Sequence, residues 1–418
     1  MAPPCSRKKR RIRNARAAPA AADALLSLPP EVLDEILGRL DLRDAVRTSA
    51  LCRAWRRRWE SLPSIDISAF SDDGKQALWT VDRVLPRFSG RIRRFQVSLD
   101  ELSARRVDDW LVLLSRRGGV EDLNLSPVFP YEFFPLHSTV FSWRRLISID
   151  LFACHIPPLP PDFEGFPDLK VLTLVNLKLQ QNGEYQLEEI IETSPLLETL
   201  ILSEVGIGGN DFIEWEIRAP NLRHITICSS IDYGWNFTEL PCLRSAVIDL
   251  REYIGDRDFA KFLAGLVQVN GVKILETLPC TFDNLKSLKL FMHFCELPPI
   301  LLLICFLKSA PNLEKLKIRI YYGEVQKTEV SGEFLNAQWT DGMCANLQLL
   351  EMTGINWLPN EMSFMKLILS KARFLHTLSI SHDDDCSVSH VDQLLELETY
   401  GRASAHAQVL FKGAAGDY

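Results

Sequence analysis

The chain has 418 residues, of which 47% are hydrophobic and 24% are charged, values typical of a soluble folded protein. Residues 1–22 hold seven basic side chains and no acidic one, so the net charge of −7 leaves the rest of the chain at −14. This acidic remainder argues against non-specific nucleic-acid binding. The most apolar run, at 300–307, is far shorter than the ~20 residues of a membrane-spanning helix, so no membrane partner is expected.

The cysteines point to a reducing compartment. Ten of them are dispersed along the chain, and no two have C-x-x-C spacing. No apolar signal segment precedes them, because the N-terminus is basic and rich in alanine. We therefore expect buried thiols and no disulfides.

Residues 1–24 are expected to form a disordered basic tail. The run "RKKRRIRNAR" has the density of a nuclear localisation signal or a nucleic-acid-binding arm, and its alternative is a solubilising tail. We expect no base-specific binding, and the run indicates a location in the nucleus, the cytoplasm or both. The candidate localisation residues are Arg7, Lys8, Lys9, Arg10, Arg11 and Arg13.

The sequence pattern of residues 25–62 predicts three short helices. Pro29 and Pro30 open the first, where a missing N–H has no cost, and an apolar stripe at i, i+3, i+4 and i+7 follows from Leu33 to Leu40. Asp41 followed by Asp44 indicates the start of the second helix, which carries Val46. The third carries the remaining large side chains, Leu51, Cys52, Trp55 and Trp59. A helical unit of this size commonly depends on a partner for stability.

This segment resembles the F-box in the pattern Leu28-Pro29-x-Glu31-Val32-Leu33-x-x-Ile36-Leu37, followed by Val46, Ser49, Leu51-Cys52 and Trp55. The resemblance implies docking onto the Skp-family adaptor, and through it a cullin, in an SCF ubiquitin ligase. The alternative is that these side chains only form a core, which we favour for Leu33, Leu51 and Trp59. The residues implied at or beside the adaptor interface are Leu28, Pro29, Val32, Ile36, Leu37, Leu40, Val46, Ser49, Cys52 and Trp55.

After a linker helix at 63–87, a repeated phrase occupies 88–380. "SPLLETLIL", "APNLRHITI", "APNLEKLKI", "CANLQLLEM" and "ARFLHTLSI" share the template L-x-x-L-x-L, and most successive copies lie 21 to 29 residues apart, the period of leucine-rich repeats. The copies near 243–285 are irregular. The anchoring apolar residues are Ile92, Val120, Leu146, Leu169, Leu197, Leu222, Leu243, Val272 or Leu285, Leu313, Leu347 and Leu375.

A repeat of this kind buries its apolar face only by stacking on its neighbours. The sequence therefore predicts an α/β fold, in which a three-helix F-box precedes a curved leucine-rich-repeat solenoid of short parallel strands with helical or irregular return segments. The alternative is an ordinary mixed α/β domain in which the leucines share this spacing by chance. Alternation along each strand directs some side chains away from the core, and these are candidate contact positions: Thr173, Ile201, Thr226, Lys289 and Lys317.

The remaining segment, 381–418, is similar to the C-terminal FBD-type segment of plant F-box/leucine-rich-repeat proteins. Its most telling piece is "RAS-x-x-AQVLF" at 402–411. The first half of the matching stretch fits one more repeat equally well. We expect this segment to close the solenoid.

No local sequence pattern predicts catalysis. "HDDDC" at 382–386 lacks a second ligand cluster at metal-site spacing, and no G-x-S-x-G, H-E-x-x-H or P-loop occurs. We expect no active site, metal or cofactor. The leading hypothesis is a non-catalytic substrate-recognition subunit of an SCF E3 ubiquitin ligase, which binds an unidentified protein substrate through the repeats. The alternative is a nuclear protein-interaction scaffold that acts without a cullin ligase.

Overall fold

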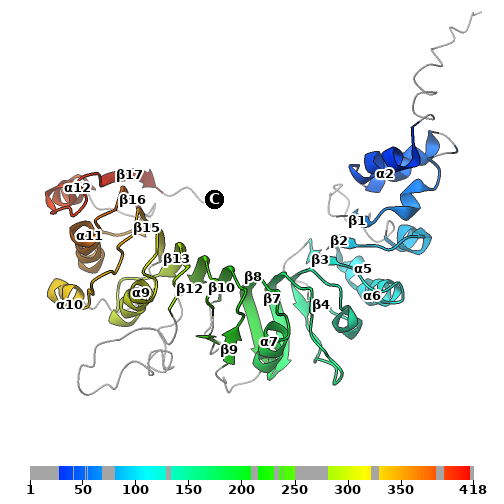
Figure 1. The fold of residues 1–418 in the computed structure, drawn as a ribbon, viewed down its shortest axis with the longest axis horizontal. Helices are drawn as coiled ribbons and strands as arrows, with labels where there is room; N and C mark the ends of the chain where they lie inside the picture. The colour runs from blue at the N-terminus through cyan, green and yellow to red at the C-terminus, as the bar shows by residue number, and fades with distance from the viewer. Residues whose placement is uncertain are drawn as a thin grey trace, which may run out of the picture.

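The computed structural model describes residues 28–40, 42–51, 53, 55–67, 81–128, 133–208, 215–229, 235–238, 240–249, 281–321, 329–382 and 390–414. These residues build an open arc with strands along its inner side and helices along its outer side (Figure 1). The N-terminal helices stand at one end of the arc and the last strand at the other. The predicted order, a small helical unit followed by a curved solenoid of short parallel strands, is confirmed.

One parallel sheet runs the length of the arc. Its strands follow one another in chain order and each pairs with its neighbours in parallel, so the topology is that of stacked repeats rather than of a mixed domain. The strands, in spatial order, are β1 (Ser64–Ile67), β2 (Arg94–Leu99), β3 (Asp122–Pro127), β5 (Ser148–Phe152), β7 (Val171–Gln181), β8 (Thr199–Gly208), β10 (His224–Cys228), β12 (Ser245–Asp249), β13 (Ser287–Met292), β14 (Lys315–Ile320), β15 (Leu349–Ile355), β16 (Thr377–His382) and β17 (Gln408–Ala414).

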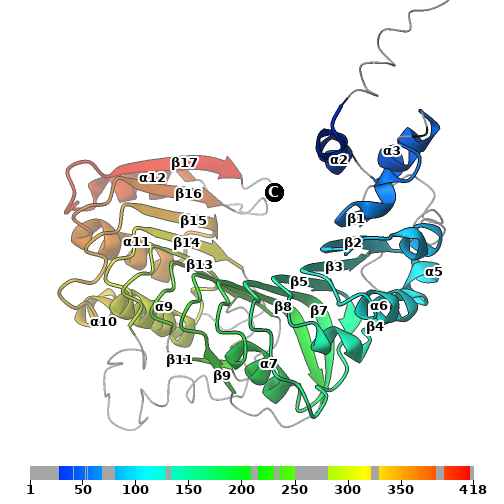
Figure 2. The same ribbon diagram turned by 45° about the vertical axis from the view of Figure 1, so that its right-hand side comes forward.

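Short strands and return segments cover the outer side (Figure 2). β4 (Phe134–Pro135) pairs with β6 (Cys154–His155), and β9 (Trp215–Arg218) with β11 (Trp235–Thr238). No described helix is long and apolar enough to cross a membrane. The helices are α2 (Pro30–Gly38), α3 (Leu42–Arg47), α5 (Glu101–Ala104), α6 (Val107–Ser115), α7 (Gly183–Glu192), α9 (Leu297–Ser309), α10 (Gly332–Ala337), α11 (Pro359–Lys371) and α12 (His390–Thr399), with 3-10 turns η1 (Thr48–Ala50), η2 (Arg58–Ser61), η3 (Leu85–Arg87) and η4 (Ser138–Ser142).

The repeat anchors lie in one continuous core. Every predicted anchor that the structure describes is at most 1% exposed, because the template places it at the turn where the chain enters the strand. In the irregular region near 243–285, Leu285 is fully buried and β12 pairs directly with β13. The other candidate anchor, Val272, lies outside the described residues. The alternation of buried and half-exposed residues along each strand then leaves one face of the sheet lining the inside of the arc.

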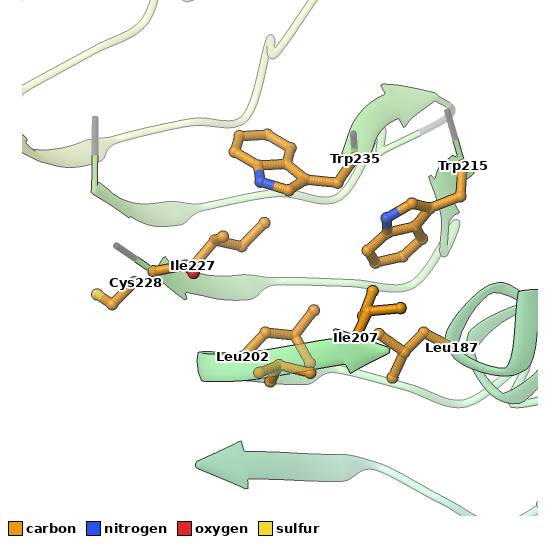
Figure 3. Close-up of a pocket in the computed structure, with 9 residues that line it drawn as sticks. Leu187, Leu202, Ile207, Trp215, Ile227, Cys228 and Trp235 are labelled. Atoms are coloured by element: carbon orange, nitrogen blue, oxygen red, sulfur yellow. The ribbon is translucent and has the colours of Figure 1, made fainter. Parts of the chain in front are cut away.

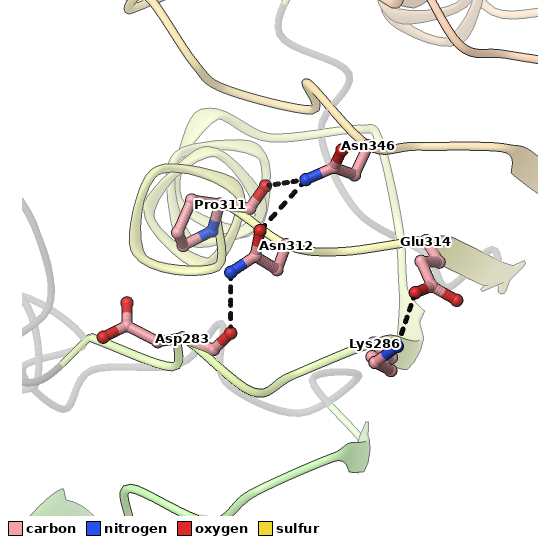
Figure 4. Close-up of polar contacts among 6 residues, drawn as sticks. All are labelled: Asp283, Lys286, Pro311, Asn312, Glu314 and Asn346. Atoms are coloured by element: carbon pink, nitrogen blue, oxygen red, sulfur yellow. Dashed lines mark hydrogen bonds and ion pairs between the residues drawn. The ribbon is translucent and has the colours of Figure 1, made fainter.

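A ladder of asparagines joins successive repeats at the turn before each strand. In the phrase "PNL", the asparagine amide donates to a backbone carbonyl of the preceding repeat: Asn221 to Pro195 at 2.8 Å and Asn312 to Asp283 at 2.9 Å. Asn346 donates to the Pro311 carbonyl at 3.4 Å and to Asn312 Oδ1 at 3.0 Å (Figure 4). Nearby, Lys286 pairs with Glu314 at 2.7 Å.

Replacing one asparagine of this ladder by alanine tests the contribution of the ladder to stability. Asn312→Ala breaks two hydrogen bonds at an exposed turn, so we expect a loss of about 1 kcal/mol in the free energy of unfolding. Chemical denaturation followed by circular dichroism measures the change. Asn336→Ala, on the exposed side of α10, is the matched control and should change stability by less than about 0.5 kcal/mol. Equal effects of the two variants would contradict a structural role for the ladder.

Two boundaries differ from the predicted ones. The 63–87 segment was expected to be a linker helix, but it begins as β1, which pairs with β2, and turns helical only at 81–84 and in η3; residues 68–80 lie outside the described residues. Ile65 is fully buried in the sheet, which explains why the segment extends the solenoid. At the other end, β17 pairs with β16 and adds a further strand instead of only a cap. Most of "HDDDC" lies outside the described residues.

Candidate functional site

The N-terminal helices form a small unit with a shared core. α2 begins at Pro30 and turns Leu33 and Leu37 inward, where they are 3% and 0% exposed. Arg58 ties the end of the segment back to α2 through Asp34 at 2.8 Å and the Pro30 carbonyl at 3.1 Å. In place of the predicted third helix, the described residues after α3 form only the 3-10 turns η1 and η2.

Apolar side chains on the outside of this unit form what we name the F-box surface. Leu51 is 63% exposed, Leu40 38% and Val32 37%, and Pro29 is also exposed. Leu28, Ile36, Val46 and Ser49 of the same unit are half-buried. Several large apolar groups left in solvent on one small unit are typical of a protein-binding site.

The structure shows the burial of three predicted residues. Leu37 and Trp55, expected at or beside the adaptor interface, are 0% and 3% exposed and lie in the core of this unit, because α2 packs its inner face on the turns that follow. Leu51, expected in the core, is the most exposed of the apolar residues here. Cys52 lies outside the described residues.

The unit is fixed to the solenoid by its last aromatic residue. Trp59, 3% exposed as predicted for a core residue, meets Phe88 edge-on with ring centroids 5.8 Å apart. The Ser89 N–H donates to the Glu60 carbonyl at 2.7 Å. β1 continues directly into the sheet. The N-terminal unit is therefore held at one end of the arc (Figure 1).

A second candidate surface lines the inner side of the arc. The five candidate contact positions fall in one row, because the register pairs Thr173 with Ile201, Ile201 with Thr226, and Lys289 with Lys317. Val247 connects the two parts of this row. Sequence alternation alone was enough to find these positions.

Charge changes along this row. Near the N-terminal end, Asn124 donates to Asp150 at 2.7 Å, and burial raises the pKa of the Asp150 carboxyl. Near the other end, Glu351 lies between Lys317, 2.8 Å away, and Lys412, 3.3 Å away. The hydrogen bond from Lys317, followed by the charges of both lysines, lowers the pKa of Glu351 in spite of its partial burial.

The lowered pKa predicts a dependence of stability on pH. A carboxyl whose pKa is lower in the folded state stabilises the protein above its unfolded pKa of 4.5, and this contribution is lost as the pH falls through the folded value. Glu351→Gln should therefore be less stable than wild type near neutral pH and lose less stability below pH 4.5. Thermal melts at both pH values measure this difference. An unchanged pH dependence would contradict the role of the pair.

An apolar cavity lies between the sheet and the outer layer (Figure 3). Trp215 of β9 and Trp235 of β11 lie over Leu202 of β8 and Ile227 of β10, and Leu187 of α7 closes one side. Its volume of about 20 Å³ holds little more than a water molecule, and its walls offer almost no polar partner for one. The cavity is a packing gap in the core rather than a ligand site.

The described cysteines carry thiols rather than disulfides, and four of the six are buried. Burial raises the pKa of the Cys305 thiol to about 11 and that of Cys344 to about 12, so both stay protonated and unreactive at neutral pH. Within the described ranges, no three acidic, histidine or cysteine side chains are grouped to hold a metal. The basic run at 7–16, with Arg7 to Arg13, lies outside the described residues.

Comparison with known proteins finds family models that match two segments of the chain. An F-box domain model matches residues 25–66, and a model described as "FBD-associated F-box protein At5g56370, LRR repeats" matches 107–260. F-box/FBD/LRR-repeat protein At1g13570 of Arabidopsis thaliana is 26% identical over 93% of this chain and 98% of its own length. FBD-associated F-box protein At5g27750 of the same plant is 24% identical over 87% and 92%.

A solved structure is also similar in outline. An LRR protein of Leptospira interrogans covers 85% of this chain and 91% of its own, with 14% identity and a TM-score of 0.33. This degree of similarity adds nothing to the assignment of the surfaces.

Proposed function

Because this chain is an F-box/leucine-rich-repeat protein with an FBD-like C-terminal segment, of the kind found in plants, we propose that it is the substrate-recognition subunit of an SCF E3 ubiquitin ligase. Proteins with an F-box and leucine-rich repeats act in general as non-catalytic adaptors of such ligases. In this proposal the F-box surface docks a Skp-family adaptor, and through it a cullin. The repeats hold the protein to be ubiquitinated, and other subunits carry out the transfer.

The observation that carries the proposal is the exposed apolar side of the F-box. Val32, Leu40 and Leu51 stand in solvent over the core formed by Leu33 and Leu37. Full burial of a large apolar side chain contributes roughly 1.5–3 kcal/mol, so a few such residues supply a strong anchor once association costs are met.

The position of the two surfaces supports a bridging role. The F-box surface lies at one end of the arc, and the inner face of the sheet lies along its length (Figure 2). A partner at the end therefore leaves most of the inner face open to a second protein. This arrangement suits a subunit that holds an adaptor and a target at the same time.

Co-purification from plant cells tests the proposal. The tagged full-length chain should bring down a Skp-family adaptor together with a cullin. If neither arrives with a folded chain, the SCF assignment fails and the nuclear scaffold becomes the better account.

We further propose that the chain works in the nucleus, the cytoplasm or both, and the basic run at 7–16 supports this location. A fluorescent fusion that enters neither compartment would contradict it.

A further inference from the structure

The C-terminal half of the inner face carries an excess of positive charge. The register places Lys289 of β13 beside Lys317 of β14, and Arg319 lies one step further along the same strand face. Lys315 opens that strand on the same face and is exposed. Because alternate residues of a strand share a face, these cations converge on one area of the inner surface.

Only part of this charge is balanced within the protein. Glu351 accepts from Lys317 and Lys412, which leaves one carboxylate for two ammonium groups. In the part of the chain that the structure describes, neither Lys289 nor Lys315 forms an ion pair with a carboxylate. Asp249 is in register with Phe291 but is 1% exposed, so a segment bound at the surface does not reach it.

Aromatic rings lie among these cations. Phe291 stacks on Tyr321 with ring centroids 6.1 Å apart and an interplanar angle of 19°. The Lys289 ammonium lies 4.8 Å from the centre of the Phe291 ring, and the Arg319 guanidinium 5.3 Å from that of Tyr321. Both rings are half-buried, so they offer a flat apolar surface between positive groups.

The excess of positive charge is confined to the C-terminal half of the inner face. Toward the F-box, the same face carries Asp66, Asp122 and Asp150 against one cation, Arg94, which pairs with Asp122 at 3.3 Å, and the whole chain has a net charge of −7. A nucleic acid, with charge along its entire length, would meet this acidic half as well. A short acidic segment would engage the positive half alone.

We propose that Lys289, Phe291, Lys315, Lys317, Arg319 and Tyr321, named here the basic aromatic patch, bind an acidic protein segment that also carries an aromatic or large apolar side chain. Carboxylates would meet the ammonium and guanidinium groups, and the apolar side chain would lie on the stacked rings. The inference rests on the proposed function, since it states the chemistry of the target that the inner face would hold.

Fluorescence anisotropy with the full-length chain tests the patch. The probe is a labelled peptide of glutamates with phenylalanines at intervals, compared with a peptide in which glutamine replaces every glutamate. We expect Lys289→Gln/Lys317→Gln to weaken binding of the acidic peptide about fivefold or more at low salt, and added salt to weaken the wild type. The matched control is Arg116→Gln/Lys371→Gln, which removes the same charge from exposed positions on the outer helices.

Three results overturn the patch: no binding of the acidic peptide, equal binding of the glutamine peptide, or equal losses in the two double variants. Tighter binding of a single-stranded RNA at the same residues also overturns it. Adaptor capture is measured on the same preparations. Capture without peptide binding refutes the patch and leaves the ligase proposal, whereas peptide binding without capture supports the patch and contradicts the ligase proposal.

Discussion

Replacing Val32 and Leu51 by aspartate is expected to abolish capture of the Skp-family adaptor, with a loss of affinity of at least about 100-fold. Both side chains are exposed, at 37% and 63%, so the change leaves the folded chain intact. In the complex, each substitution removes a buried apolar contact and places a charge in a dry interface. Pull-down with purified adaptor, followed by quantitative binding, measures the effect.

The control for this double variant is Leu395→Asp on α12, where the leucine is 56% exposed at the opposite end of the arc. This control also replaces an exposed leucine by aspartate, and the variant should capture the adaptor like wild type. Leu37→Asp is not a suitable test, because Leu37 is fully buried and a charge there would unfold the unit. Full capture by the Val32→Asp/Leu51→Asp variant would refute the F-box surface.

Asn360→Ala is expected to lower the free energy of unfolding by about 2–6 kcal/mol, the largest stability effect predicted here. Asn360 is 4% exposed in α11; its Oδ1 accepts from the Val330 N–H and its Nδ2 donates to the Phe294 carbonyl, both at 2.7 Å. Removal of the amide leaves two buried backbone groups without these partners, and each unsatisfied group costs about 1–3 kcal/mol.

Denaturation followed by circular dichroism measures the cost of Asn360→Ala. Ser363→Ala, on the same helix and only half-buried, is the control and should change stability by less than about 0.5 kcal/mol. Because repeats interact mainly with their neighbours, the damage should extend to the repeats around β13 and β15, which Asn360 connects. Loss of less than about 0.5 kcal/mol would contradict the structural role of the amide.

The repeat architecture was predictable because its physics is local. Each strand needs apolar residues at fixed spacing, so Leu146, Leu169 and Leu197 could be assigned to the core from the phrase that contains them. Alternation then identified the inner row that contains Thr173 and Lys289. The same reasoning left Val272 and Leu285 as alternatives, because both fit the pattern and only the pairing of β12 with β13 distinguishes them.

Features that depend on distant contacts were not predictable. Leu37 and Leu51 are both apolar residues of short helical segments, and only the packing of α2 on the following turns decides which of them faces solvent. Asn360 bonds to Phe294 across 66 positions of the chain, with no local signal. The asparagine ladder corresponds to a local sequence pattern, the recurring "PNL". Because successive repeats stack, the asparagine amide in this phrase donates to a backbone carbonyl of the preceding repeat.

The central claim is that the F-box surface, and not the repeat face, holds the adaptor. Hydrogen–deuterium exchange of the full-length chain, with and without a purified Skp-family adaptor, tests it most directly. The account predicts slower exchange in α2, α3 and η1, which carry Val32 or lie directly beside Leu40 and Leu51, and unchanged exchange in the strands from β2 to β16. Protection confined to the inner strands, or no protection anywhere, would contradict it.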